Sequence, residues 1–208
     1  MLMALIFVSA GTVHYWQAWL FIVVFTLCNI ALTAYLWEYD QKLLSQRVYG
    51  GYWLEQERVQ KIIMLTLSII SLFQVIVSAL DYRLQSHRMA TASVLSGDVL
   101  VVIGFLIMSL VFRVNGYASA TIEITSDQKA ISTGPYALVR HPMYAGGFLT
   151  LLGIPIALGS WWGVAVFAAM APLFIFRLIH EEHFLCERLP GYKEYQTQVR
   201  WRLFPGIF

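Results

Sequence analysis

Residues 143–176 read MYAGGFLTLLGIPIALGSWWGVAVFAAMAPLFIF, a run of 34 residues without a charged side chain. A helix needs only about 20 apolar residues to cross the hydrocarbon core of a bilayer, so this run is too long for one span. Its middle contains residues that favour turns or interrupt helices: Gly153, Pro155, Gly159 and Ser160. The run therefore predicts a hairpin of two membrane helices that turns near Gly159, with the second helix continuing to about His180.

Three further apolar runs precede the predicted hairpin. They cover residues 18–37, 62–80 and 91–112, and the third is interrupted only by Asp98. The chain as a whole is 59% hydrophobic and only 12% charged, whereas soluble domains carry about 25% charged residues. The sequence predicts an all-α, polytopic membrane protein with about five transmembrane helices. Residues 1–10 are apolar but too few to span, so we expect a half-inserted or interfacial segment there.

The basic residues predict the orientation of these spans. If the N-terminus lies outside, twelve of the fourteen lysines and arginines fall in cytosolic segments, and only Arg83 and Arg88 fall outside. Cytosolic loops of membrane proteins carry such an excess of basic residues. We therefore expect an inner or plasma membrane protein whose residues 114–142 and C-terminal tail both face the cytosol.

The first chemically unusual stretch is GPYALVRHPMYAG, residues 134–146. Gly134 and Pro135 favour a turn. Pro142 suits the first turn of the following helix, where its missing N–H is not needed, and it restricts His141 to an extended conformation. Arg140 and His141 are thus held at the cytosolic mouth of a membrane helix. On local grounds alone, an interfacial anchor explains this pattern equally well.

The second stretch is RLIHEE, residues 177–182, at the end of the last predicted span. Arg177 and Glu181 are four residues apart and share a helix face. Ionisable groups at this depth are costly and face a cavity or each other, so a structural ion pair is the simpler interpretation. The sequence PGYKEY, residues 190–195, then predicts a short cytosolic amphipathic helix that lies on the membrane surface.

These elements together resemble one family. The order of these elements is similar to that in the isoprenylcysteine carboxyl methyltransferases. It runs GPY, RHPxY, a helical hairpin, RxxxEE, Leu185, Gly191-Tyr192 and a further tyrosine. Related phospholipid methyltransferases share much of it. The resemblance covers about residues 113–205, and residues 11–19 match prokaryotic members more loosely. It implies a methyltransferase core over residues 113–208 and an N-terminal transmembrane region over residues 1–112 that shapes the acceptor site.

The resemblance also implies a cofactor and its ligands. The cofactor would be S-adenosylmethionine, with S-adenosylhomocysteine as product, and the match assigns Arg177 to the methyl acceptor as the catalytic residue. A looser alignment adds Thr121 to the cofactor contacts. By position, the cofactor-binding residues would be Gln128, Lys129, Ala130, Ile131, Tyr136, His141, Pro142, Met143, Tyr144 and Glu181.

The acceptor is the least determined part of this interpretation. We expect a lipophilic carboxylate that enters from the bilayer, because a guanidinium binds a carboxylate through two parallel hydrogen bonds. Phospholipid amine N-methylation, a sterol-type NADPH-dependent reductase and a non-enzymatic scaffold remain alternatives. Compared with the larger eukaryotic enzymes, this chain has fewer N-terminal spans and a shorter stretch before Tyr192, which leaves the substrate open.

Other polar residues receive simpler interpretations. The histidines show no metal-ligand spacing, so no metal is expected. No nucleic-acid partner is expected either. Cys28 and Cys186 are expected to be free thiols. Asp98 is expected to pair with a polar neighbour such as Asn29 or Gln74, although it could instead line the acceptor cavity. The sequence leaves the oligomeric state open.

Overall fold

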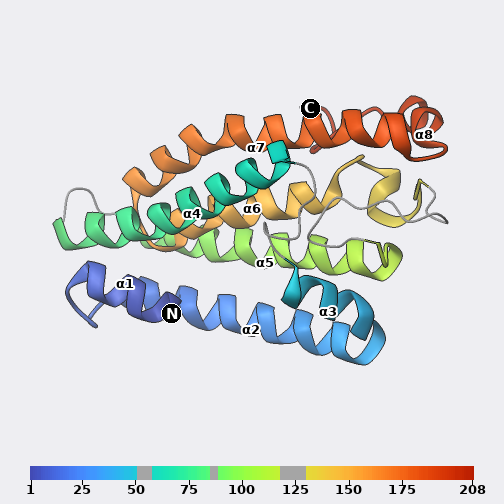
Figure 1. Ribbon diagram of the computed structural model, residues 1–208. Helices are drawn as coiled ribbons and strands as arrows, with labels where there is room; N and C mark the ends of the chain where they lie inside the picture. Colours follow the sequence, from blue (N-terminus) through green and yellow to red (C-terminus); the bar gives the residue numbers. More distant parts are fainter. Residues whose placement is uncertain (51–57, 85–88, 118–129) are drawn as a thin grey trace.

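The computed structural model describes residues 1–50, 58–84, 89–117 and 130–208, and this part of the chain is helical without strands (Figure 1). The helices lie roughly along one common direction. In chain order they are α1 (Leu2–Ala10), α2 (Trp16–Tyr39), α3 (Gln41–Tyr49), α4 (Arg58–Leu84), α5 (Thr91–Val114), the 3-10 helix η1 (Gly134–Ala137), α6 (Pro142–Ala157), α7 (Trp161–Arg188) and α8 (Tyr192–Gln198).

Four of the described helices, α2, α4, α5 and α7, are long and apolar enough to cross a membrane. Helix α6 is a shorter apolar helix of 16 residues. Large apolar side chains on these helices are exposed, for example Leu27 at 60% and Ile62 at 65%, which suits contact with lipid rather than water. The prediction of an all-α membrane protein with about five spans is confirmed.

The predicted hairpin is formed by α6 and α7. Gly159 has a φ of 72°, which a residue with a side chain rarely adopts. The Ser160 hydroxyl oxygen then accepts a hydrogen bond from the Gly163 amide at 2.9 Å and caps the start of α7. Helix α7 extends to Arg188, eight residues beyond the expected end at His180.

Glycines permit close contact between α5 and α6. A Cβ atom added at Gly104 would lie 2.6 Å from the carbonyl oxygen of Gly146, and one added at Gly153 would lie 2.7 Å from that of Gly97. Small residues at such contacts allow membrane helices to approach backbone to backbone. The predicted boundary between an N-terminal region (residues 1–112) and a methyltransferase core (residues 113–208) falls near the end of α5. Helices α5 and α6 pack closely across this boundary, and the division stays a prediction.

Helix α1 lies beside α2 and α4 (Figure 1). Ile6 and Ala10 of α1 are buried in one cluster with Ala18 of α2 and Ala79 of α4. The first ten residues are therefore packed against the bundle, which gives this short helix a stable place without the length needed to span.

Polar contacts join the bundle at the end where α6 turns into α7. The Ser160 hydroxyl donates to Asp81 Oδ2 at 2.7 Å, and the Tyr15 hydroxyl donates to the carbonyl oxygen of Leu158. The ring of Tyr15 stacks on that of Tyr82 at 3.8 Å between centroids. These contacts tie α2 and α4 to the tip of the hairpin.

The predicted pairing of Asp98 is wrong. Asn29 donates to the carbonyl oxygen of Phe25 in its own helix, and Gln74 donates to the carbonyl oxygens of Leu151 and Gly163. Asp98 is buried, and within the described ranges its carboxylate oxygens have no hydrogen-bond partner. The amide nitrogens of Asn29 and Gln74 thus donate to backbone carbonyl oxygens rather than to Asp98.

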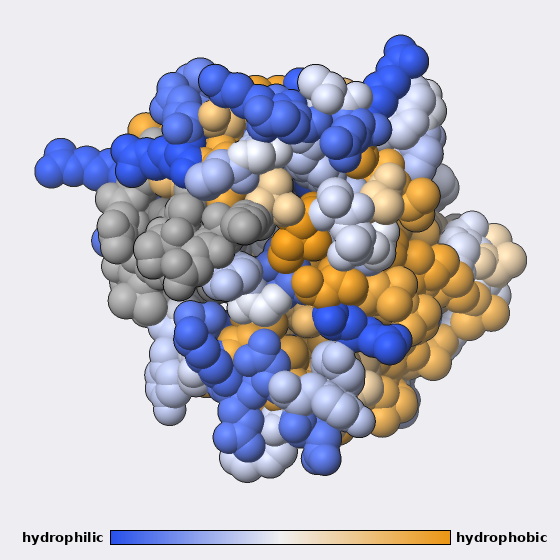
Figure 2. Space-filling model, turned by 90° about the vertical axis from the view of Figure 1, so that its right-hand side faces the viewer, coloured by the Kyte–Doolittle hydropathy of each residue, from blue (hydrophilic) through white to orange (hydrophobic). Residues whose placement is uncertain are grey.

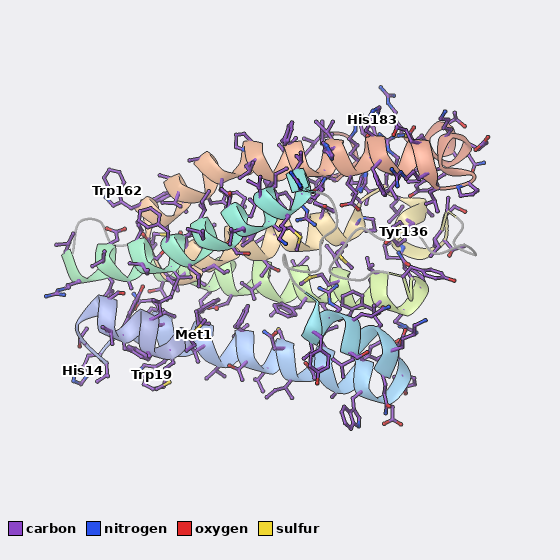
Figure 3. All side chains as sticks on the ribbon, viewed as in Figure 1. Met1, His14, Trp19, Tyr136, Trp162 and His183 are labelled. Carbon is purple, nitrogen blue, oxygen red and sulfur yellow. The ribbon has the colours of Figure 1, made fainter. Side chains whose placement is uncertain are left out.

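The two chemically unusual stretches meet at the opposite end of the bundle, which also carries α3, η1 and α8 (Figure 1). Figure 3 labels Tyr136 and His183 there, whereas His14 and Trp162 lie at the other end. Figure 2 shows this end face-on, with hydrophilic side chains at its upper and lower margins and apolar surface between them. The fold therefore brings residues 134–146 and 177–182 together.

Candidate active site

The start of α6 is held by the C-terminal tail of the chain. Pro142 occupies the first turn of α6, as predicted. His141 precedes it as the N-cap residue with φ −125° and ψ 63°, so the extended conformation expected for it is wrong. The backbone amide of Arg140 donates to the carbonyl oxygen of Trp201 at 2.8 Å, and that of His141 donates to the carbonyl oxygen of Arg202 at 2.9 Å. The tail thus satisfies two amides that precede the helix and would otherwise lack partners.

Glu182 is the centre of a buried charge network beside this contact. Its carboxylate accepts from Arg140 Nε at 2.6 Å and from Arg202 Nε at 2.7 Å. His141 Nε2 lies 3.6 Å from the same carboxylate. Glu182 is only 4% exposed and Arg140 only 8%, so each charge needs the other. Glu182 thus holds α7, the start of α6 and the C-terminal tail together.

Glu181 has different neighbours. The hydroxyl of Tyr144 donates to Glu181 Oε2, and Arg177 Nε donates to the same hydroxyl oxygen at 2.9 Å. Each of these three residues is partly exposed as a whole. Three residues that the sequence assigns to the site, two from α7 and one from α6, therefore meet at one hydroxyl group.

Two further tyrosines surround Glu181. Burial raises the pKa of Tyr136 to about 12, and the negative charge of Glu181 contributes to the increase. Burial and the charges of Glu182 and Glu181 also raise the pKa of Tyr192. Both phenols therefore stay neutral at physiological pH and remain hydrogen-bond donors. A carboxylate among neutral aromatic hydroxyls is a suitable site for a cation or for a ligand rich in hydroxyl and amino groups.

Tyr136 is itself held from both sides. Its hydroxyl oxygen accepts from Asn115 Nδ2 at 2.7 Å, and its carbonyl oxygen accepts from the Tyr195 hydroxyl at 2.7 Å. Ala130 and Tyr136 pack against a cluster that includes Tyr192 and Tyr195 of α8. The aromatic face of α8 therefore packs on the protein, and the location of this helix on the membrane surface stays a prediction.

The remaining predicted cofactor residues differ in their positions. His141 and Pro142 are buried, and the Tyr192 hydroxyl lies 3.3 Å from His141 Nε2. Met143 faces α3, where Arg47 Nη1 donates to its sulfur at 3.9 Å. Ile131 is half-buried. Thr121, Gln128 and Lys129 lie outside the described residues.

Sequence reasoning missed several residues that shape the site. Tyr192 and Tyr195 follow a Pro-Gly turn at helical spacing and could have been assigned to an inward face. Arg202 and Asn115 gave no such signal, because their partners lie 20 and 21 residues away in the chain. The contact of Gln60 with His180 joins residues 120 positions apart, which no local pattern reveals.

Comparisons with known proteins cover the part of the chain that contains these residues. Residues 92–190 match the model of the family described as Phospholipid methyltransferase. The matched segment contains α5, η1, α6 and α7, and therefore Tyr136, Tyr144, Arg177 and Glu181. It ends before α8 and the C-terminal tail.

One curated relative is the cobalt-zinc-cadmium resistance protein CzcN of Cupriavidus metallidurans. It is 29% identical over 102 residues, which cover 49% of this chain and 47% of the relative. The match thus spans about half the length of that protein. Within the described ranges, no group of three or more His, Cys, Asp or Glu side chains is placed to hold a metal ion. This chain thus has four described helices that are long and apolar enough to cross a membrane, and a segment of just under half its length is similar to the phospholipid methyltransferases.

Proposed function

We propose that this protein transfers a methyl group from S-adenosylmethionine to a lipophilic acceptor in the membrane. The observation that carries the proposal is the contact of Arg177 and Glu181 with the one hydroxyl group of Tyr144. A carboxylate for the cofactor and a guanidinium for the acceptor thus lie side by side on α7. The family match over residues 92–190 supports the same reaction class.

The residues around Glu181 fit the cofactor by their chemistry. Its carboxylate can accept hydrogen bonds from an amine or from ribose hydroxyls. The rings of Tyr136, Tyr144 and Tyr192 offer aromatic faces that suit adenine and a positively charged sulfonium. When bound, the cofactor supplies the methyl group that leaves its sulfur. Ala130, Ile131 and the segment from His141 to Met143 complete the described part of the proposed binding site.

Arg177 would hold the acceptor. Its Nε–H is bonded to Tyr144, which fixes the plane of the guanidinium. A guanidinium held in this way can align a carboxylate with two oxygens on two N–H groups. A carboxylate is already a nucleophile at neutral pH, so the protein supplies orientation rather than a base. A prenylated cysteine-type carboxylate is the acceptor that we favour.

The family match raises one second candidate, methylation of a phospholipid amine. An ammonium head group must lose a proton before it can accept a methyl group, and Arg177 would repel its charge. The two candidates therefore differ in the charge that the acceptor presents to α7. We further propose that the N-terminus lies outside and that this site faces the cytosol, in agreement with the distribution of basic residues.

Binding of the product tests the proposal directly. We expect the purified protein in detergent to bind S-adenosylhomocysteine by calorimetry and not to bind NADPH. Transfer of a tritiated methyl group to S-farnesyl-N-acetylcysteine and to phosphatidylethanolamine vesicles then compares the two acceptor classes. Binding of NADPH without binding of S-adenosylhomocysteine would contradict a methyltransferase function, and label in phosphatidylethanolamine alone would favour the amine candidate.

Arg177→Lys should separate the acceptor from the cofactor. Lysine keeps the charge but loses the planar fork, and a hydrogen bond to a charged group is worth about 1.5–3 kcal/mol. We expect the KM for S-farnesyl-N-acetylcysteine to rise by about tenfold or more, whereas the affinity for S-adenosylhomocysteine changes less than twofold. Arg188→Lys is the matched control, because Arg188 is exposed on the same helix. An unchanged KM in Arg177→Lys would remove the acceptor role.

A further inference from the structure

A fully buried glutamine of α4 contacts the same part of α7. Gln60 has an exposure of 0%, and its Nε2 lies 2.9 Å from His180 Nδ1. Its amide oxygen is buried, and among the described residues it has no hydrogen-bond partner. Burial of an amide without full compensation costs free energy. The partner of the Gln60 amide nitrogen is a side chain of α7 rather than a backbone carbonyl oxygen.

A second buried glutamine on α4 differs in the partner of its amide nitrogen. Gln74 is also 0% exposed, and its amide oxygen likewise has no hydrogen-bond partner among the described residues, but its amide nitrogen donates to two backbone carbonyl oxygens, those of Leu151 and Gly163. Gln74 thus ties helices together through their backbones. Gln60 instead contacts a side chain that can itself act on a ligand.

His180 lies beside the residues of the proposed active site. It follows Arg177 by three positions on α7, so the two side chains are neighbours on one helix face, and it directly precedes Glu181. When the Gln60 amide N–H donates to Nδ1, the proton of a neutral imidazole is on Nε2. In that tautomer His180 carries an N–H donor three positions along α7 from Arg177.

We propose that Gln60 is a positioning residue that sets acceptor specificity by holding His180 as a hydrogen-bond donor beside Arg177. This inference rests on the proposed methyl transfer and specifies its acceptor as a head group with two oxygen acceptors, a carboxylate. One acceptor oxygen forms the bond to the methyl carbon as the bond from sulfur to that carbon breaks, and no proton moves. Such a reaction needs N–H donors at the acceptor and no base.

The position of Gln60 in the chain adds to this argument. Gln60 lies outside the segment that matches the phospholipid methyltransferase family, residues 92–190, whereas Arg177 and Glu181 lie inside it. The cofactor and the acceptor guanidinium are thus assigned to the shared core. The contact of Gln60 of α4 with His180 can therefore make the acceptor of this chain differ from those of other proteins that share the core.

Gln60→Met tests the inference because it removes the amide at nearly constant volume. We expect the KM for S-farnesyl-N-acetylcysteine to rise about tenfold, whereas the affinity for S-adenosylhomocysteine stays within twofold of the wild-type value. Gln74→Met is the matched control, since it removes an equally buried amide from the same helix. It should lower the thermal midpoint and leave that KM within twofold.

His180→Phe keeps the test valid if Gln60→Met yields no folded protein. We expect the same rise in KM, and the double variant should show no further rise, because both changes remove one contact. Rescue by His180→Gln, which restores an amide N–H donor, would support the role further. An unchanged KM in Gln60→Met or His180→Phe would overturn the inference.

Two other outcomes are also decisive. A loss of S-adenosylhomocysteine affinity equal to the rise in KM would make the contact merely structural and would overturn the inference. The same holds if phosphatidylethanolamine is the accepted substrate and its turnover depends on His180, because His180 would then act as a base. If the wild-type protein binds no S-adenosylhomocysteine, the proposed function fails first. If it is active and the variants are unaffected, only the inference on Gln60 fails.

Discussion

Replacing Glu182 with glutamine should remove most of the folded protein, whereas the same change at Glu181 should leave the fold intact and weaken cofactor binding. Glu182 accepts from both Arg140 and Arg202 and is 4% exposed. Removing one partner of a buried ion pair costs about 3–5 kcal/mol, because the other charge is left unpaired. Since proteins are stable by only about 5–15 kcal/mol, this loss is severe.

Glu181→Gln has a different physical consequence. The glutamine oxygen can still accept the hydrogen bond from Tyr144, so the local geometry is kept. The variant loses the negative charge that the proposed cofactor contacts, and a hydrogen bond to a charged group is worth about 1.5–3 kcal/mol. We expect the affinity for S-adenosylhomocysteine to fall by about 10- to 100-fold.

The two variants control each other, because they make one chemical change at adjacent positions of α7. Thermal unfolding and the fraction of monodisperse protein in detergent report the fold, and calorimetry with S-adenosylhomocysteine reports the site. We expect a large loss of midpoint only in Glu182→Gln. If Glu181→Gln destabilised the protein as strongly as Glu182→Gln, Glu181 would be structural, and the proposed cofactor site would lose its central residue.

The sequence could not separate these two glutamates. Adjacent residues on a helix point about 100° apart, and which one turns inward depends on what packs against the helix. Here the tail residues that include Arg202 and the loop that includes Arg140 lie on the Glu182 side. Neither contact follows from a local pattern, because Arg202 and Arg140 lie 20 and 42 residues from Glu182 in the chain.

The spans were predictable for a simpler reason. A bilayer imposes a minimum apolar length on each helix, and charges mark where a helix leaves the membrane. Residues 143–176 exceed that length, and Gly159 allows the turn, so the hairpin follows from composition and one glycine. The end of α7 at Arg188 was not predictable in the same way, because its last turns are stabilised by contacts with the tail and α8 rather than by lipid.

Asp98 shows the limit of pairing arguments. Its predicted partners were chosen because they are polar and lie in neighbouring spans. Amide side chains in membrane helices can instead bond to backbone carbonyl oxygens, as Asn29 and Gln74 do. Polarity and position in a neighbouring span therefore do not predict which groups Asp98 contacts.

Gly146→Ala should destabilise the protein strongly, whereas Gly147→Ala should not. A Cβ atom at Gly146 would lie 2.7 Å from the carbonyl oxygen of Gly104, which is closer than van der Waals contact allows. A Cβ atom at Gly147 would meet only Phe174 Cζ at 3.7 Å, an ordinary contact. Since the obstacle at Gly146 is the backbone of α5, the helices themselves must move apart.

The expected effects can be sized from packing. Forcing an extra methyl group into a well-packed interior costs about 1–3 kcal/mol, and separating α5 from α6 also removes contacts around Gly97 and Gly153. Alanine is a better helix former than glycine by about 1 kcal/mol, so Gly147→Ala should unfold at or slightly above the wild-type midpoint. We expect Gly146→Ala to lower the midpoint by several degrees or to yield little folded protein.

Thermal unfolding in detergent of the two variants beside the wild type checks this prediction. The two substitutions are chemically identical and adjacent, so a difference between them reports the α5 contact alone. Equal midpoints would contradict the close packing of α5 on α6. That packing places Val114, the last residue of α5, where its side chain meets Gly134, and so sets the position of η1 and Tyr136. A shift at Gly146 should therefore also weaken binding of S-adenosylhomocysteine in the protein that still folds.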